Sequence, residues 1–158
     1  MKLNIDNAVE FCKKAHFGQD RKYTGEPYWT HPYAVYESVK LFTDNIEIQI
    51  ASLLHDVIED CGYNKADISS TFNVKISEIV FELTDKYTKE EYPDLNRKER
   101  KFLEACRLKD ISQEAKLIKY FDIMDNSKTI FALDTRFAKK YLAEKQFIIG
   151  YSLADLKL

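Results

Sequence analysis

Glycine and proline are scarce in this chain: four glycines and three prolines are spread over 158 residues. Few breaker residues leave long uninterrupted segments, which favours helices over many short strands. No apolar run approaches the ~20 residues needed to cross a bilayer, and the first residues, MKLNIDNAVEF, have no signal-peptide core. We therefore expect a cytoplasmic protein with no membrane partner.

Charge and cysteine content exclude two further classes. The net charge is −2, so the chain has neither a basic nucleic-acid footprint nor an acidic tail. Cys12, Cys61 and Cys106 are odd in number and far apart, and no C-x-x-C spacing occurs. Neither a zinc knuckle nor a disulfide framework is indicated. We expect reduced thiols and no nucleic-acid partner; the oligomeric state is left open.

Hydrophobic residues make up 45% of the chain, enough to build a core in one domain of this length. We find no repeat, linker or low-complexity segment, and the apolar spacing is helical nearly everywhere. No segment alternates well enough to be a strand. The sequence predicts an all-α helical bundle, with residues 1–158 as a single domain.

The predicted helix boundaries follow from caps and breakers. Residues 5–16 form the first helix, and a loop at 17–30 precedes a helix from Pro32 to about Phe42. Asn45 caps a third helix that stops at Gly62. Later helices are expected within 65–84 with a break near Asn73, and then at about 97–108, 111–128 and 137–150. Asp110 with Gln113 resembles a capping box, and the polar stretch 85–96 is predicted to be a mobile loop.

Only three histidines occur, and one of them lies in the segment HDVIED of an otherwise apolar helix. Helical spacing would place His55 above Glu59 and Asp56 above Asp60. Two acids near a helix C-terminus are disfavoured by the helix dipole, and a nearby cation would remove that penalty. A solvated acidic helix end is the alternative; beside a His-Asp pair we favour the cation.

Two other residues complete the candidate metal set. Asp122 lies on the edge of an apolar helix face, where a lone carboxylate is costly unless it is paired or binds a metal. An ion pair with Lys119 is the competing interpretation. His31 precedes a proline at a helix start, and alone it would be read as a surface or capping histidine. Two imidazoles and two carboxylates suit a borderline divalent metal such as Mn²⁺, Fe²⁺, Co²⁺ or Zn²⁺.

Three segments together resemble a known family: AHFGQDRKYTGEPYWTHPYAV, ASLLHDVIED and IKYFDIMDN, in this order. They are similar to the hydrolase domain of the RelA/SpoT family, and more closely to its stand-alone small alarmone hydrolases, among them the metazoan SpoT homologue. The match covers about residues 4–150. The resemblance implies an all-helical HD domain with one metal ion, usually Mn²⁺. It also implies removal of the 3′-pyrophosphate from (p)ppGpp to give GDP or GTP.

The resemblance also implies roles for individual residues. His31, His55, Asp56 and Asp122 would be the metal ligands, and Glu59 with Asp60 would orient or activate the attacking water. Arg21 would stack on the base. The residues expected near phosphate, ribose or base are Lys22, Lys119, Asn126 and Thr129.

Some residues depart from the family pattern or have two interpretations. Tyr120 and Phe121 replace the common leucine-alanine before the metal-binding aspartate, and Trp29 replaces an aliphatic residue, which bears on pocket shape and substrate choice. His16 and Gln19 would brace the Arg21 loop, or His16 would simply be a satisfied core histidine.

Three functional hypotheses follow. The first is a metal-dependent (p)ppGpp 3′-pyrophosphohydrolase. The second is the same machinery acting on another nucleotide, such as NADPH. The third is a metal-bearing nucleotide sensor without turnover, against which the acidic pair Glu59 and Asp60 argues, since a sensor needs no proton acceptor.

Overall fold

A computed structural model describes residues 3–157 of the chain. This part contains nine α-helices, one π-helical turn and no β-strand; its only β-type pairing is an isolated bridge between Asp20 and Pro27. The helices are α1 (Ile5–Ala15), α2 (Thr30–Val39), α3 (Ile46–Leu54), α4 (Val57–Asp60), α5 (Lys65–Thr71), α6 (Val74–Leu83), α7 (Arg97–Leu108), α8 (Gln113–Leu133) and α9 (Thr135–Phe147), followed by η1 (Ile148–Ser152). The all-α prediction is confirmed.

Side-chain caps define where most helices begin. Asn45 accepts a hydrogen bond from the backbone N–H of Glu47, and Asn73 accepts one from Ile76. Asn64 with Asp67 forms a full capping box, and so does Asn96 at the start of α7. Such caps satisfy backbone donors that have no partner inside the helix. Asparagine N-caps, more than glycine or proline, therefore define where the helices of this chain begin.

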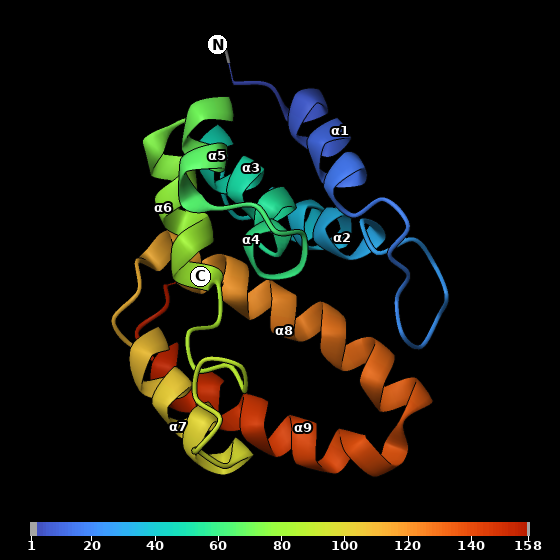
Figure 1. Cartoon of the computed structure of the whole chain (residues 1–158), viewed down its shortest axis with the longest axis vertical. Helices are drawn as coiled ribbons and strands as arrows, with labels where there is room; N and C mark the ends of the chain where they lie inside the picture. Colours follow the sequence, from blue (N-terminus) through green and yellow to red (C-terminus); the bar gives the residue numbers. More distant parts are fainter. Residues whose placement is uncertain (1–2, 158) are drawn as a thin grey trace.

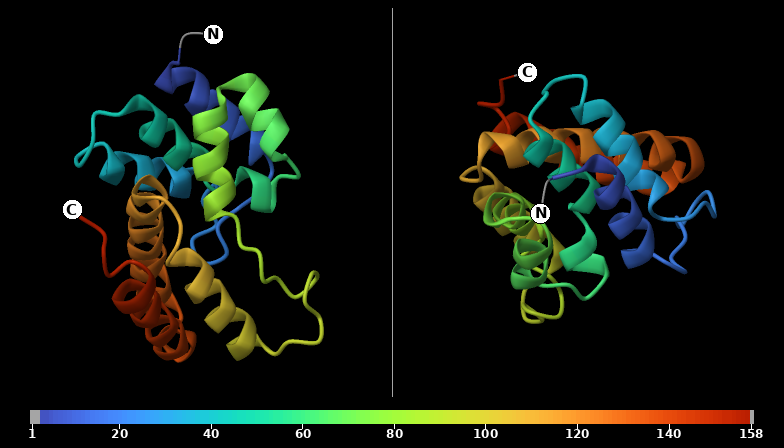
Figure 2. Two further views of the ribbon diagram at one scale, coloured as in Figure 1. Left: turned by 90° about the vertical axis from the view of Figure 1, so that its left-hand side faces the viewer. Right: turned by 90° about the horizontal axis from the view of Figure 1, so that it is seen from above.

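The apolar helix α3 forms the centre of the core. Ile50, Leu53 and Leu54 are completely buried, and the helix packs against α1, α2, α6 and α8. The long helix α8 crosses the molecule between the group α1–α6 and the pair α7 and α9 (Figure 1). Two further views show that α9 folds back along α8 and that the segment between α6 and α7 forms an open loop (Figure 2). Helix α8 therefore joins the two parts of the molecule.

Several predicted boundaries were wrong. The helix capped by Asn45 does not continue to Gly62, because it ends at Leu54 and α4 starts at Val57. His55 and Asp56 lie at this break, so Glu59 and Asp60 belong to a separate four-residue helix. The predicted penalty from the dipole of a long helix therefore does not apply to them.

The C-terminal helices also differ from the prediction. Helix α8 is capped by Ser112, whose hydroxyl accepts from the N–H of Ala115, so the expected box of Asp110 and Gln113 does not form. It continues to Leu133 instead of ending near 128, and Asp134 then caps α9. Helix α2 begins at Thr30 and ends at Val39, before Phe42.

The stretch 85–96 contains no helix, as predicted. Its start is held by α7: the buried carboxylate of Glu104 accepts from the N–H groups of Lys86 and Tyr87, at 3.1 Å each. The Nζ of Lys101 lies 3.0 Å from Oδ2 of Asp85. Among the described residues, no helix is long and apolar enough to cross a membrane.

Candidate metal centre

Two buried histidines from different helices point their Nε2 atoms toward the same position in the core. His31 in α2 and His55 at the end of α3 are 1% and 3% exposed. Nδ1 of His55 lies 2.8 Å from the carbonyl oxygen of Ser52, and a carbonyl can only accept, so Nδ1 carries the proton. Nδ1 of His31 lies 2.7 Å from Oδ2 of Asp125 and is assigned the same way. In its neutral form each ring therefore has its lone pair at Nε2. Despite burial, the nearby carboxylates raise the pKa of both rings, so a metal ion that binds at Nε2 displaces a proton there.

Two carboxylates meet these lone pairs. Oδ2 of Asp56 lies 3.1 Å from Nε2 of His55, and Oδ1 of Asp122 lies 3.2 Å from Nε2 of His31. The crossed distances are 3.6 Å from His31 to Asp56 and 3.8 Å from His55 to Asp122. The structure thus brings together all four residues that the sequence predicted as ligands. They come from α2, the α3–α4 break and α8.

The two Nε2 atoms are the buried side-chain polar atoms without a hydrogen-bond partner in the described part of the chain. The nearby carboxylate oxygens approach them, but not in hydrogen-bonding geometry. A buried polar atom without a partner is costly, and a metal ion is one way to satisfy it. Ligand atoms of His31, His55 and Asp122 all lie within 4.8 Å of one another. This donor set fits a divalent metal ion.

Neighbouring charges shift the pKa values of the candidate ligands. Burial opposes protonation of His31, but Asp122 and Asp125 raise the pKa of its ring to about 9. Burial would raise the pKa of Asp56, yet His55 lowers it to about 2. The pKa of Asp122 is lowered well below its usual range, against the effect of burial, by Lys119 and both histidines. The carboxylates at the centre of the site are therefore ionised.

Asp122 is also held by its own helix. Nζ of Lys119 lies 3.0 Å from its Oδ2, and the amide of Asn126 donates to its Oδ1 at 2.7 Å. The ion pair that competed with the metal interpretation therefore exists beside the histidines. The two interpretations are compatible because the carboxylate has two oxygens, and Oδ1 is the one that faces the imidazoles.

Glu59 lies on α4 beside the start of the 85–96 stretch. Its Oε2 accepts from the N–H of Asp85 at 3.1 Å. Burial raises the pKa of Glu59 to about 7, with a further contribution from Asp85 and Asp56, while the Asp85 N–H and Lys119 oppose the change. A carboxylate with this pKa can accept a proton near neutral pH and release it again.

Asp60, the other predicted catalytic acid, lies at the end of α4. Burial and the charge of Asp56 raise its pKa. Gln19 donates to the backbone carbonyl of Asp60 at 3.0 Å, and its Oε1 lies 2.8 Å from Nδ1 of His16. His16 and Gln19 therefore connect the loop after α1 to α4, which agrees with the bracing interpretation.

The guanidinium of Arg21 lies against α8, just C-terminal to the candidate ligand Asp122. Nη1 lies 3.0 Å from Oδ2 of Asp125, and Nη2 donates to Asn126 and Thr129 at 3.4 Å each. Three of the predicted substrate-binding residues thus form one polar group. Lys22 does not join it, because its exposed Nζ lies over the ring of Tyr23 at 5.2 Å.

Sequence reasoning missed three residues of this site. Asp125 holds both His31 and Arg21, and its position three residues after Asp122 could have identified it. Tyr28 donates its hydroxyl to Oδ2 of Asp56 at 2.9 Å. Lys145 in α9 has a pKa lowered to about 8 by burial and by the charge of Lys119. No local pattern connects α9 with α8, so Lys145 could not be found from the sequence.

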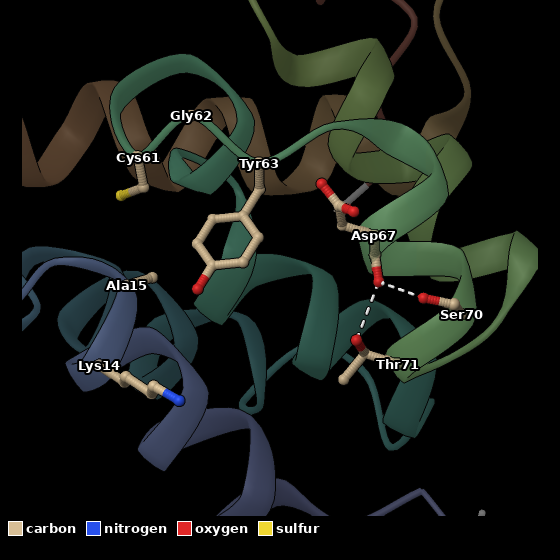
Figure 3. Close-up of a pocket in the computed structure, with 8 residues that line it drawn as sticks. All are labelled: Lys14, Ala15, Cys61, Gly62, Tyr63, Asp67, Ser70 and Thr71. Carbon is tan, nitrogen blue, oxygen red and sulfur yellow. Dashed lines mark hydrogen bonds between the residues drawn. The ribbon is translucent and has the colours of Figure 1, made fainter.

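A separate hollow of about 530 Å³ lies between the end of α1 and α5 (Figure 3). Ser70 and Thr71 donate their hydroxyls to the backbone carbonyl of Asp67. Its polar groups are thus partly used within the wall, and none of the four candidate ligands lines it. We therefore place the chemistry at the two histidines and not in this hollow.

The fold and site define a helical domain with a buried His/Asp centre suited to a divalent metal. A family model described as HD domain matches residues 8–143. The chain belongs to the HD domain family, whose members bind a divalent metal.

Individual relatives have more specific descriptions. The chain is 32% identical over 96% of its length to a probable guanosine-3′,5′-bis(diphosphate) 3′-pyrophosphohydrolase of Mycoplasma pneumoniae. A protein of Aquifex aeolicus, described as the same enzyme, is 32% identical over 89% of the chain. The chain spans about 20% of the length of each of these two relatives. The resemblance found in the motifs is confirmed.

One solved structure matches most of both chains. It is described as a metazoan ortholog of SpoT that hydrolyzes ppGpp and plays a role in starvation responses. The TM-score is 0.80 at 25% identity, covering 92% of this chain and 83% of that one. The HD-domain helical bundle is thus confirmed as the fold.

Proposed function

We propose that this protein is a metal-dependent nucleotide phosphohydrolase that removes pyrophosphate from the 3′ position of (p)ppGpp, giving GDP or GTP. The observation that carries the proposal is the convergence of two buried, unpartnered Nε2 atoms with Asp56 and Asp122. Glu59, whose pKa is about 7, lies on the next helix. The descriptions of the relatives support the choice of substrate.

His31, His55, Asp56 and Asp122 would hold the metal ion. Mixed nitrogen and oxygen ligands suit a borderline divalent ion, and we propose Mn²⁺. When bound, such an ion lowers the pKa of a water molecule and polarises a phosphoryl oxygen. Ser52 and Asp125 would fix the tautomers of the two histidines through Nδ1.

The other side chains would bind the substrate and transfer the proton. Glu59, with Asp60, would orient the attacking water and accept its proton. Lys119 would neutralise negative charge near the phosphates, since Asp122 and Asp85 raise its pKa despite burial and it stays charged. Arg21 would stack on the base, and Asn126 and Thr129 would hold the ribose end. Lys22, exposed beside this group, would meet the outer phosphates.

The decisive experiment is a nucleotide panel with Mn²⁺, in which ppGpp, pppGpp, NADPH and GTP are incubated with the protein and the products separated by chromatography. We expect ppGpp to yield GDP and pyrophosphate in equal amounts. Brisk turnover of NADPH without release of pyrophosphate from ppGpp would contradict the alarmone substrate and leave the metallohydrolase intact. Binding of nucleotides without any turnover would contradict the enzyme and favour a sensor.

A further inference from the structure

A groove of about 550 Å³ lies between α7 and α9, away from the metal centre. None of the four candidate metal ligands lines it. Its volume lies within the range of roughly 300–1,000 Å³ that is typical of small-molecule sites. Figure 1 shows α7 next to the C-terminal end of α9, at the end of the molecule opposite α1. The groove is therefore a second place where a ligand of nucleotide size could bind.

The floor of the groove is aromatic and unusually exposed. Phe102 of α7 and Phe147 of α9 are 56% and 45% exposed. Their rings stack with centroids 6.3 Å apart, and Phe147 stacks on Tyr151 at 5.2 Å with an angle of 9°. Exposed aromatic side chains that gather in one patch often mark a ligand-binding groove or an interaction site, whereas single exposed apolar side chains are common and need no explanation. A planar ring can extend this stack at Phe102, its most exposed member.

The rim of the groove is positively charged. Arg97 is neutralised by Glu144 through two hydrogen bonds of 3.1 and 2.9 Å. Lys98 and Lys140, both exposed, have no ion pair within residues 3–157. Lys101 also lines the groove. Aromatic rings together with unneutralised lysines complement a ligand that is planar at one end and anionic at the other.

We propose that this groove is a second binding site for a nucleoside diphosphate or polyphosphate, with the base stacked on Phe102 and Phe147 and the phosphates bound by Lys98 and Lys140. Lys101 connects the groove indirectly to the reaction site. Lys101 pairs with Asp85 at 3.0 Å, and the N–H of Asp85 donates to Glu59 at 3.1 Å. Phosphates that compete with Asp85 for Lys101 leave the negative charge of Asp85 less compensated beside Glu59. Asp56 and the α8 residue Lys119 also face Glu59, and their charges do not change. The binding site is independent of the function proposed above, and only this link rests on it.

Binding is measured by calorimetric titration of the full chain, loaded with Mn²⁺, with GDP or ADP. We expect two equivalents of GDP per chain, one in the groove and one at the metal centre; only the second rests on the proposed function. Phe147→Ala weakens one of the two sites by roughly 5- to 150-fold, the loss expected for one stacked base. Lys140→Glu weakens the same site because it places a negative charge beside the phosphates. The matched controls are Lys139→Glu, an exposed lysine next along α9, and Phe131→Ala, an exposed phenylalanine of α8. Both controls keep two sites. Circular dichroism establishes that each variant is folded.

Three results overturn the site. They are GDP binding that Lys140→Glu and Phe147→Ala leave unchanged, equal losses in the control variants, and inorganic pyrophosphate that binds the groove as tightly as GDP. The last result would mean that the rings do not hold the base. The link to Glu59 has its own readout: saturating ADP shifts the acidic limb of the pH profile of hydrolysis in the unmodified protein and not in Lys140→Glu. An unmoved limb with ADP bound refutes the link and leaves the site standing.

Discussion

The metal centre and the α7–α9 groove break the usual rule of burial in opposite directions. At the metal centre, polar groups such as His31, His55 and Asp122 are buried, whereas in the groove Phe102 and Phe147 are exposed. Polar groups normally lie outside and large apolar patches inside. In our proposals a ligand would relieve each exception: a cation for the imidazoles and a planar ring for the phenylalanines. The comparison separates the buried residues that we propose as metal ligands from the exposed residues that we propose to bind by stacking and charge.

The largest effect is expected at the metal centre. His55→Ala removes one of the two Nε2 lone pairs, so metal content measured by atomic absorption and hydrolysis of ppGpp should both fall below detection. His16→Ala is the control, because the third histidine contacts Gln19 and Cys61 and not the ligands. Metal loss of equal size in His16→Ala would mean that the fold, not the ligand, was damaged.

Glu59→Gln should separate metal binding from proton transfer. The amide cannot accept a proton, and a general base contributes about 10²–10⁴-fold. We expect kcat to fall by roughly that factor while metal content stays at one ion per chain. Glu78→Gln, at an exposed glutamate of α6, is the matched control. If Glu59→Gln lost as much metal as His55→Ala, Glu59 would have to be a ligand.

Asp125→Asn tests whether a residue outside the ligand set fixes the metal site. Asn can still accept from Nδ1 of His31, but it loses the charge that also pairs with Arg21. Residues that orient metal-binding histidines typically contribute about 10–100-fold in metal affinity. The affinity is read from a Mn²⁺ titration followed by electron paramagnetic resonance. Asp110→Asn, an exposed acid outside the site, should leave it unchanged.

The pH profile tests Glu59 as the base. Burial together with Asp85 and Asp56 raises the pKa of Glu59 to about 7, against Lys119. The protonated form cannot accept a proton, so kcat/KM should rise with pH through about 7 and fall about tenfold per unit below it. Glu59→Gln should flatten this limb. An unchanged limb in that variant would assign it to another group.

The smallest effect is expected at the α7–α9 groove. Lys101→Met leaves Asp85 without its ion pair, so the negative charge beside Glu59 is less compensated. The acidic limb should move upward by about 0.3 pH unit, because a partly exposed pair is well screened. Metal content should stay the same. A loss of metal in Lys101→Met would show that the two regions are not separable in this way.

Sequence alone determined the class of fold and the four candidate ligands. Helical periodicity is a local property, so it predicted α1, α5, α6 and α7 closely. The scarcity of histidine and the HDVIED segment identified His55 and Asp56 without any knowledge of packing. The break at these two residues was not predictable, because no glycine or proline stands between Leu54 and Val57 to mark it.

Only the tertiary structure decided which Nε2 atoms face each other, that Asp125 holds His31, and that Tyr28 holds Asp56. These contacts join residues 94 and 28 positions apart. It also decided the exposed stack of Phe102 and Phe147, which in the sequence are ordinary apolar positions of two helices. The physical reason is that periodicity tells which face of a helix is apolar, whereas the packing of several helices decides whether that face, or a polar group within it, is covered.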